Sequence, residues 1–312
     1  EKDLKEQDMR VICFCDFIVD FTSDEPGKTL SQVDLFRKHP GGAPANVAVG
    51  LLHHGVKPVL WSKVGDDSFG RYLVEQVRQF GMDVEGIRID PAHPTKIAFV
   101  GLNEAGERYF EFHNKDSAER YIRSNDVNLA QLEEGSILQF GGVALLGETT
   151  FRTTLRILRI ARQNNCLVCF DPNIRLDLVG NRTEIQSRLN KVLSYVDILK
   201  LSVEDWSAFF SHASPEQLVQ KQLSLLIMTE GEDGVRFITP EHRVFVQAEQ
   251  VNVVDTTGAG DAFLAAFLSR MAQSDLKQPL QFGTAQLTEW GRFATKWAGR
   301  VISEVGAVSA YS

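Results

Sequence analysis

A glycine-rich turn that leads into an acid stands late in the chain, within VVDTTGAGDAFLAAFLSRM, residues 253–271. We expect a strand end, a tight turn and then an apolar helix that begins near Gly258. The amides of Gly258, Ala259 and Gly260 would be unpaired there and would bind an anion, because the helix dipole adds partial positive charge. The dipole also favours the charged form of Asp261 in the first turn. Such a carboxylate can accept a proton from a hydroxyl that attacks phosphorus, which indicates phosphoryl transfer.

A purely structural turn with a helix-start carboxylate is the alternative for this stretch. A capping residue precedes its helix, however, whereas Asp261 follows three small residues into it. The helix behind is also too apolar for a surface helix. Neither the P-loop pattern with its lysine nor G-x-G-x-x-G after a strand occurs in the sequence, so phosphate would be bound without the usual phosphate loops.

A second glycine-rich stretch, GGAPANVAVG at residues 41–50, stands at the head of another expected helix. Gly41 and Gly42 have no side chain, so a ligand can lie directly against the main chain. Asn46 adds an amide that both donates and accepts hydrogen bonds. The stretch suits a small ligand with several hydroxyl groups, but by itself it fits a plain tight turn equally well.

These motifs must be positioned by the elements around them, and the apolar pattern alternates between strands and helices. Amphipathic helices are expected at residues 68–81, 149–165 and 183–196. The expected strands are residues 11–21, 59–65, 137–145, 167–172, 197–202 and 225–231. This alternation predicts an α/β fold with a mostly parallel sheet and helices on both faces. Ligands bind beyond the carboxyl ends of such strands, where polar and glycine residues gather in this sequence.

One region breaks the alternation. Residues 95–112 predict a hairpin around the turn Asn103-Glu104-Ala105-Gly106, and residues 20–37 lack helical periodicity. We therefore expect a single domain over residues 1–312, with a small β lid formed by about residues 20–38 and 93–115. The strand edges of the lid could pair between two copies, which makes a homodimer through the lid an expectation.

The composition is that of an ordinary globular protein, with 43% apolar and 24% charged residues among 312. The net charge is −8 and no basic run occurs, which argues against nucleic acid as a partner. There is no apolar run of transmembrane length, and the first residues, EKDLKEQDMR, are charged where a signal peptide would be apolar. We expect no membrane partner and a cytoplasmic location.

The four cysteines stand in CFC and CLVC, a spacing that could hold zinc. Both pairs lie within apolar runs that predict buried strands. Residues three apart in a strand point to opposite faces, so Cys166 and Cys169 could not converge on one ion. Buried thiols in the core are therefore expected at Cys13, Cys15, Cys166 and Cys169, with a metal site as the alternative.

The two glycine motifs together resemble those of the PfkB, or ribokinase-like, sugar kinases, most closely the fructokinases, and the resemblance covers nearly the whole chain. In GGAPANVAVGLLHHG and the following KVG, the glycines and Asn46 keep the family spacing, and DTTGAGDAF at residues 255–263 matches the second family motif. The resemblance implies a ribokinase-like three-layer fold, ATP as the phosphoryl donor and magnesium as cofactor. Potassium is a further cofactor in some relatives.

The resemblance also implies roles for individual residues. Asp261 matches the catalytic base, and Gly258, Ala259 and Gly260 match the anion hole. The remaining positions fall into three groups: sugar contacts at Asp20, Gly41, Gly42, Asn46 and Arg175; nucleotide contacts at Lys200, Ser202, Thr229, Gly231 and a loop near Thr295; and metal positions at Asp205, for magnesium through water, and at Asp255 and Thr257, for potassium.

Departures from the family pattern bear on the substrate. Cys15 and Asp16 stand where relatives usually have glycine and glutamate. His113 and Asn114 follow Phe112, where relatives commonly have a tyrosine and an arginine that would pair with a sugar acid. His113 is expected to be a lid histidine, with a catalytic base as the alternative. Of the lid aromatics Phe110 and Phe112, one is expected to face the core of the lid.

The resulting expectation is ATP-dependent phosphorylation of a neutral ketohexose, foremost D-fructose to fructose 6-phosphate. One alternative is the same chemistry on another acceptor, namely 2-keto-3-deoxygluconate, another ketose, a sugar phosphate or a nucleoside. The other alternative is a catalytically silent sugar-binding protein.

Overall fold

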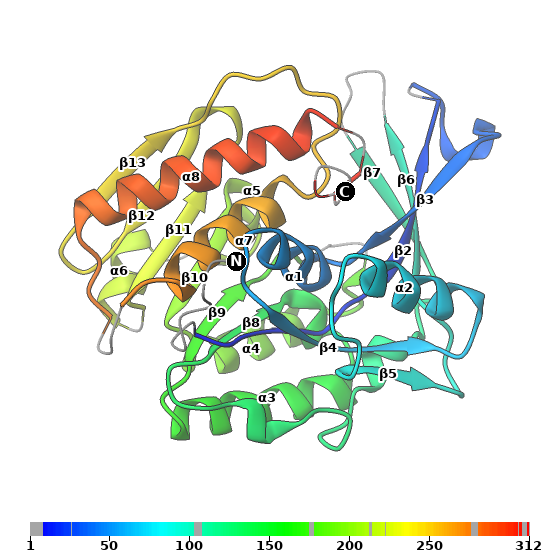
Figure 1. Ribbon diagram of the computed structural model, residues 1–312, viewed down its shortest axis with the longest axis horizontal. Helices are drawn as coiled ribbons and strands as arrows, with labels where there is room; N and C mark the ends of the chain where they lie inside the picture. The colour runs from blue at the N-terminus through cyan, green and yellow to red at the C-terminus, as the bar shows by residue number, and fades with distance from the viewer. Residues whose placement is uncertain are drawn as a thin grey trace.

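The computed structural model describes residues 9–25, 27–102, 108–174, 178–211, 214–221, 223–275, 280–304, 306–307 and 311. Within them the chain forms a large sheet, a small sheet and helices on both faces of the large one (Figure 1). The α/β fold expected from the alternating pattern is confirmed.

The large sheet has nine described strands in the order β13-β12-β11-β10-β9-β8-β1-β4-β5. All pairs from β11 to β5 are parallel, and β12 and β13 add an antiparallel edge. The bounds are β1 Val11–Phe14, β4 Pro58–Gly65, β5 Ile87–Asp90, β8 Ile137–Gly141, β9 Leu167–Asp171, β10 Ile198–Ser202, β11 Leu225–Thr229, β12 Gly234–Ile238 and β13 Arg243–Gln247. Strands β4, β9 and β10 lie where the sequence predicts them. The expected strands at residues 137–145 and 225–231 are shorter than predicted, since β8 gives way to a 3₁₀ turn at Gly142–Leu145 and β11 to one at Gly231–Asp233.

Two further expected strands are corrected. Residues 11–21 do not form one strand, because Cys15 has a φ of 115° and the chain leaves the large sheet there. Residues 253–255 are not a strand end either. The amides of Val254 and Asp255 donate to the carbonyl of Ile302 at 2.8 and 3.0 Å, so this segment is held by the end of a helix instead.

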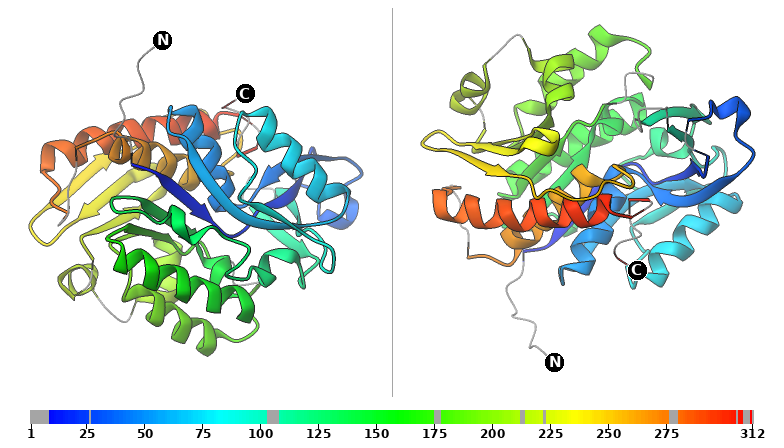
Figure 2. Two further views of the ribbon diagram at one scale, coloured as in Figure 1. Left: turned by 60° about the horizontal axis from the view of Figure 1, so that its bottom comes forward. Right: turned by 90° about the horizontal axis from the view of Figure 1, so that it is seen from above.

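Helices cover both faces of the large sheet, because its strands are apolar on both sides. One face packs against α1, α2, α7 and α8, and the other against α3 and α4 (Figure 2). The bounds are α1 Ala43–His53, α2 Ser68–Gln79, α3 Glu148–Gln163, α4 Arg182–Leu193, α5 Val203–Asp205, α6 Pro215–Lys221, α7 Ala259–Ala272 and α8 Thr284–Ile302. Helix α7 is buried along almost its whole length, as its apolar sequence predicted.

The small sheet has the order β3-β2-β6-β7 and projects from the end of the large sheet (Figure 1). Its bounds are β2 Ile18–Ser23, β3 Phe36–Gly41, β6 Ile97–Leu102 and β7 Arg108–His113. Strands β6 and β7 pair antiparallel, which confirms the expected hairpin. Its expected turn, residues 103–106, lies outside the described residues. Strands β3 and β7 are the edges, and pairing of two copies through them stays a prediction.

The two lid aromatics correct a further expectation. Phe110 and Phe112 stack with their rings 5.8 Å apart, so they lie on the same face of β7. Residues two apart in a strand always share a face. Phe112 lies opposite Ala98, which lies opposite Asp20, so both aromatic rings share the face of Asp20. His113 lies on the other face, where it pairs with the exposed Glu111 at 3.0 Å.

All four cysteines are buried and free, as expected for core thiols. Cys13 lies in β1 and Cys169 in β9, while Cys166 just precedes β9. Burial raises the pKa of the Cys166 thiol to about 11, so this side chain stays neutral near pH 7. In the part of the chain that the structure covers, no helix has the length and apolar character needed to cross a membrane.

Candidate active site

The start of α7, in the motif DTTGAGDAF, has the geometry that its sequence predicts. Gly258 precedes α7 with a φ of 76°, a left-handed conformation that suits glycine, and Asp261 lies in the first turn. The amide of Ala259 donates to the carbonyl of Thr256 at 3.4 Å, so the expectation of three unpaired amides is corrected for this residue. For Gly258 and Gly260, no backbone acceptor is found among the described residues. Two amides are therefore open to an anion.

The two glycine motifs, far apart in sequence, meet through their polar side chains. Asn46 in α1 donates from Nδ2 to Oδ2 of Asp261 at 2.8 Å, and both residues are buried. Helices α1 and α7 lie side by side on the same face of the large sheet (Figure 1). The acid at the start of α7 is thereby oriented by the amide in α1.

Asp20 in β2 lies against the first of the paired glycines. A Cβ on Gly41 would stand 2.2 Å from Oδ2 of Asp20, so no other residue fits there without moving the carboxylate. Gly42 has a φ of 100° and a Cβ on it would stand 2.5 Å from the carbonyl oxygen of Asp16. Asp20, Gly41 and Gly42 thus form one surface at the junction of the two sheets.

A buried ion pair, which the sequence reading did not identify, lies beneath the start of α7. Lys200 Nζ donates to Oδ2 of Asp171 at 2.8 Å, and their side chains are only 6% and 1% exposed. Asp171 ends β9, and Lys200 lies in the middle of the neighbouring parallel strand β10, with Leu199 opposite Phe170. The pairing of β9 with β10 places Phe170-Asp171 beside Leu199-Lys200, and no pattern in the sequence shows that these two strands are neighbours.

The ammonium group of Lys200 also touches the anion-binding turn. A Cβ on Gly260 would stand 2.7 Å from Nζ of Lys200. Burial opposes the charged form of Lys200, but the carboxylates of Asp171, Asp261 and Asp205 outweigh it and raise its pKa. Burial raises the pKa of the Asp171 carboxyl to about 6 although Lys200 opposes this, so both members of the pair are charged near pH 7.

The nucleotide positions expected at the next two strands lie together. Ser202 ends β10 opposite Thr229, which ends β11, and Thr229 Oγ1 donates to the carbonyl of Leu201 at 3.3 Å. The Asp205 amide donates to Ser202 Oγ at 3.1 Å. In return, Ser202 Oγ donates to Oδ2 of Asp205 at 3.2 Å. Gly231 follows in a short 3₁₀ turn with a φ of 57°.

One of the expected site residues that the structure describes is not joined to this group. Thr295 lies within α8 rather than in a loop, and its Oγ1 donates to the carbonyl of Arg292 at 3.1 Å, so the expected loop is wrong. Arg175 lies outside the described residues.

Asp255 and Thr257, the residues expected at a potassium loop, form hydrogen bonds that stabilise the loop. Oδ1 of Asp255 accepts hydrogen bonds from the amide and the hydroxyl of Thr257, both at 3.0 Å, and Oδ2 accepts one from the amide of Gly306 at 2.7 Å. The Asp255 side chain therefore ties the turn before α7 to the carboxyl-terminal segment.

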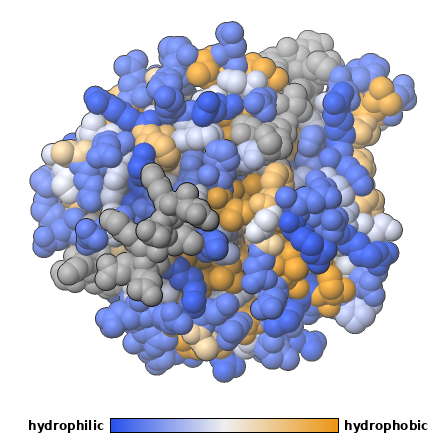
Figure 3. All heavy atoms as spheres, in the orientation of Figure 1, coloured by the Kyte–Doolittle hydropathy of each residue, from blue (hydrophilic) through white to orange (hydrophobic). Residues whose placement is uncertain are grey.

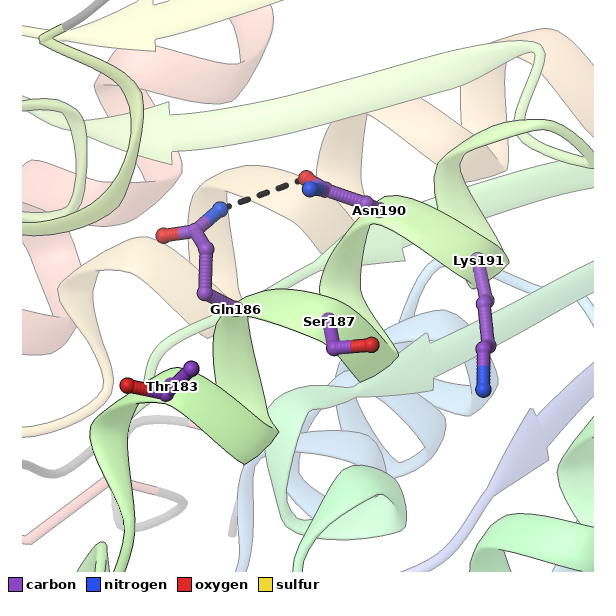
Figure 4. A pocket seen from close by; sticks show the side chains of 5 residues that line it. All are labelled: Thr183, Gln186, Ser187, Asn190 and Lys191. Atoms are coloured by element: carbon purple, nitrogen blue, oxygen red, sulfur yellow. Dashed lines mark hydrogen bonds between the residues drawn. The ribbon is translucent and has the colours of Figure 1, made fainter.

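A surface pocket of about 480 Å³ lies on α4 (Figure 4). Gln186 Nε2 donates to Asn190 Oδ1 at 3.2 Å along this helix. Its lining residues are Thr183, Gln186, Ser187, Asn190 and Lys191. None of the expected site residues lines it. The face shown in Figure 3 is mostly hydrophilic, with apolar residues reaching the surface around α1.

The large mostly parallel sheet with helices on both faces and a small β lid at its end define the ribokinase-like class of small-molecule kinases. The model of the pfkB family carbohydrate kinases matches residues 8–312. The chain therefore belongs to the PfkB family and is a sugar kinase.

Individual relatives agree with the family. Probable fructokinase-7 of Arabidopsis thaliana is 33% identical over 315 residues, which cover 99% of this chain and 91% of the relative. An uncharacterized sugar kinase from Pyrococcus horikoshii, solved in complex with ATP, is 36% identical with a TM-score of 0.83, covering 96% of this chain and 93% of that one. A fructokinase double mutant from Vibrio cholerae O395, solved with fructose, ADP and potassium ion, is 28% identical with a TM-score of 0.87, covering 98% and 96%.

Proposed function

We propose that this kinase transfers the γ-phosphoryl group of ATP to a primary hydroxyl of D-fructose and forms fructose 6-phosphate and ADP. The observation that carries the proposal is the 2.8 Å hydrogen bond between Asn46 and Asp261, which joins the polyol-binding turn to the acid at the helix start. The names of the plant relative and of the Vibrio structure support fructose as the acceptor, and the ATP in the Pyrococcus structure supports the donor.

In the proposed reaction, Asp261 accepts the proton of the attacking hydroxyl. The hydroxyl oxygen forms a bond to the γ-phosphorus, and the bond from that phosphorus to the leaving ADP oxygen breaks. The amides of Gly258 and Gly260 would stabilise the transferring group, and the third amide of the expected anion hole, Ala259, would contribute less because it already has an acceptor. Asp20, Gly41, Gly42 and Asn46 would hold the sugar hydroxyls so that one of them lies in line for attack.

The nucleotide would lie along the ends of β10 and β11. Lys200 would place a positive charge beside the phosphates, while Ser202, Thr229 and Gly231 would line the nucleotide and Thr295 would contact it from α8. The proximity of Lys200 Nζ to Gly260 supports this arrangement, because one cation then serves both the anion-binding turn and the phosphates. It compensates for the lysine that a P-loop would supply.

Magnesium fits the donors present. No cluster of three candidate ligands occurs among the described residues, but Mg²⁺ is typically held by one or two carboxylates together with substrate phosphates. Asp205 is partly exposed in α5, just after β10, and would hold the ion through water. When bound, the ion would neutralise charge on the phosphates. For potassium, the chain offers the loop between Asp255 and Thr257, whose shape the Asp255 carboxylate maintains.

One panel of acceptor assays distinguishes the proposed function from the alternative acceptors and from the catalytically silent protein. The purified protein is incubated with ATP and magnesium and with fructose, 2-keto-3-deoxygluconate, other ketoses, sugar phosphates or nucleosides, and ADP release is measured. We expect the highest kcat/KM with fructose and a phosphate on its primary hydroxyl by NMR. A better acceptor elsewhere in the panel would replace fructose, and no ADP release with any acceptor would support the silent protein.

The sugar-binding surface makes a separate prediction. Gly41→Ala is expected to raise the KM for fructose by about tenfold or more, because its Cβ must displace the Asp20 carboxylate. The KM for ATP should stay near its wild-type value. The measurement is steady-state kinetics with each substrate varied, and Gly180→Ala is the matched control, since a Cβ there meets no atom within 4 Å. Equal increases in both KM values would argue against a role of Gly41 specific to the sugar.

A further inference from the structure

Three buried charged side chains that the proposed reaction does not use lie beside the proposed sugar site. They are Asp16, in the break between β1 and β2, Lys96, just before β6, and Glu119, in the 3₁₀ turn η2 (Ala118–Tyr121). Each is less than a tenth exposed. Buried charges that serve only stability are normally paired, so each of the three needs a partner or a ligand.

Lys96 and Glu119 form a buried ion pair with each other. Lys96 Nζ lies 3.2 Å from Oε1 of Glu119, and both side chains are 2% exposed. Ser117 Oγ donates to the same carboxylate oxygen at 2.7 Å. Lys96 Nζ also lies 5.7 Å from the ring centre of Phe112, on the face of the small sheet that carries Asp20. The positive charge on this side of the site is therefore neutralised by Glu119 and is not open to an anionic acceptor.

Asp16 forms no ion pair within 4 Å among the described residues, which sets it apart from the other two. Its carbonyl lies under Gly42, and its Oδ1 lies 3.7 Å from the position that a Cβ on Gly141 would take at the end of β8. Asp16 is thus held between the glycine turn of the sugar site and the end of the neighbouring strand. Its 7% exposure leaves part of it accessible.

The surroundings of Asp16 are acidic. Burial raises the pKa of its carboxyl to about 7, and the charges of Glu119 and Asp261 add to this rise, whereas Lys96 opposes it. Asp16, Asp20 and Asp261 together place three carboxyl groups around the proposed acceptor. A hydroxyl can donate a hydrogen bond to each of them, whereas a carboxylate on the acceptor would be repelled.

We propose that Asp16 is a specificity-determining residue that accepts a hydrogen bond from a hydroxyl of the acceptor and, with the neutralised Lys96, restricts the enzyme to uncharged polyols. This assignment rests on the proposed function and deepens it, because it states which chemical class the site admits. A sugar acid is excluded by three acids and by the absence, among the described residues at this site, of a basic group without an acidic partner.

The test is the isosteric variant Asp16→Asn, compared with wild type for fructose and for 2-keto-3-deoxygluconate. We expect the KM for fructose to rise about tenfold or more with kcat almost unchanged. The variant loses a hydrogen bond to a charged group that holds the sugar equally in the ground state and in the transition state, so its loss weakens binding alone. The ratio of kcat/KM for the sugar acid to that for fructose should rise. Asp66→Asn, at an exposed surface ion pair, is the matched control and should change none of these values.

Two further readouts separate recognition from a merely structural role. Wild-type KM for fructose should fall as the pH rises from about 6 to about 8 and Asp16 ionises, and the slope should be lost in Asp16→Asn. A carboxyl with a raised folded-state pKa stabilises the fold when protonated and loses this contribution as the pH rises. The variant should therefore melt no earlier than wild type near pH 8.

Several results would overturn the assignment. They are an unchanged KM for fructose in Asp16→Asn, a loss of melting temperature together with a fall in kcat, or a wild-type preference for the sugar acid over fructose. If wild type phosphorylates no sugar at all, the proposed function fails instead. Asp16 is then tested by the rise in melting temperature that fructose causes on binding. We expect this rise to be smaller in Asp16→Asn, and an unchanged rise would show that Asp16 does not bind the sugar.

Discussion

Asp261→Asn is expected to lower kcat by about 100- to 10,000-fold, the range that a general base contributes. An amide has no capacity to take the proton of the attacking hydroxyl, whereas its size and its carbonyl oxygen preserve the hydrogen bond from Asn46. Asp261 is buried in the first turn of α7, and asparagine leaves no cavity there because its side chain has nearly the same size as that of aspartate. The fold and the binding of ATP should therefore survive, and the loss should appear in kcat rather than in KM.

The measurement is ADP release at saturating fructose and ATP, with circular dichroism and a thermal melt to show that the variant is folded. Asp275→Asn is the matched control, since this exposed acid lies just beyond the other end of α7 and should keep wild-type kcat. A folded Asp261→Asn protein with near-normal turnover would remove Asp261 from the reaction and, with it, the central assignment of this site.

The position of Asp261 could be predicted because local signals agreed. A glycine able to adopt a left-handed φ, two further small residues and a long apolar run fix the start of α7 without reference to the rest of the chain. The same holds for β9, β10 and β11, whose apolar runs end in polar residues. Parallel order then brings those ends to one edge of the sheet.

What could not be predicted depends on contacts distant in sequence. The break between β1 and β2 occurs at Cys15, which has a positive φ without being glycine, so the residue itself does not mark the break, although relatives usually have glycine there. The Asp171–Lys200 pair requires that β9 and β10 be neighbours, which the sequence pattern does not state. The loop near Thr295 that the family resemblance implies is contradicted by a local signal, since the amphipathic pattern of residues 284–302 is helical.

The Asp171–Lys200 pair carries the second prediction with a large expected effect. Lys200→Met is expected to lower the free energy of unfolding by about 3–5 kcal/mol, because it leaves the Asp171 carboxylate buried without its partner. The loss should be larger near pH 8 than near pH 5. With its folded-state pKa already raised to about 6, the unpaired carboxyl is protonated at low pH, and the fold loses stability as the pH rises and the group ionises. Urea denaturation at the two pH values measures both effects.

The double variant Lys200→Met/Asp171→Leu separates stability from catalysis. Since replacing both members of a buried pair by apolar residues of similar size is often close to neutral, it should recover most of the lost stability. It should still be slow, with kcat lowered by about 100-fold, because no ammonium group remains against Gly260 to face the transferring phosphoryl group. A stable double variant with wild-type kcat would confine the pair to a structural role. A Lys200→Met protein as stable as wild type at both pH values would show instead that Asp171 finds another partner when the lysine is lost.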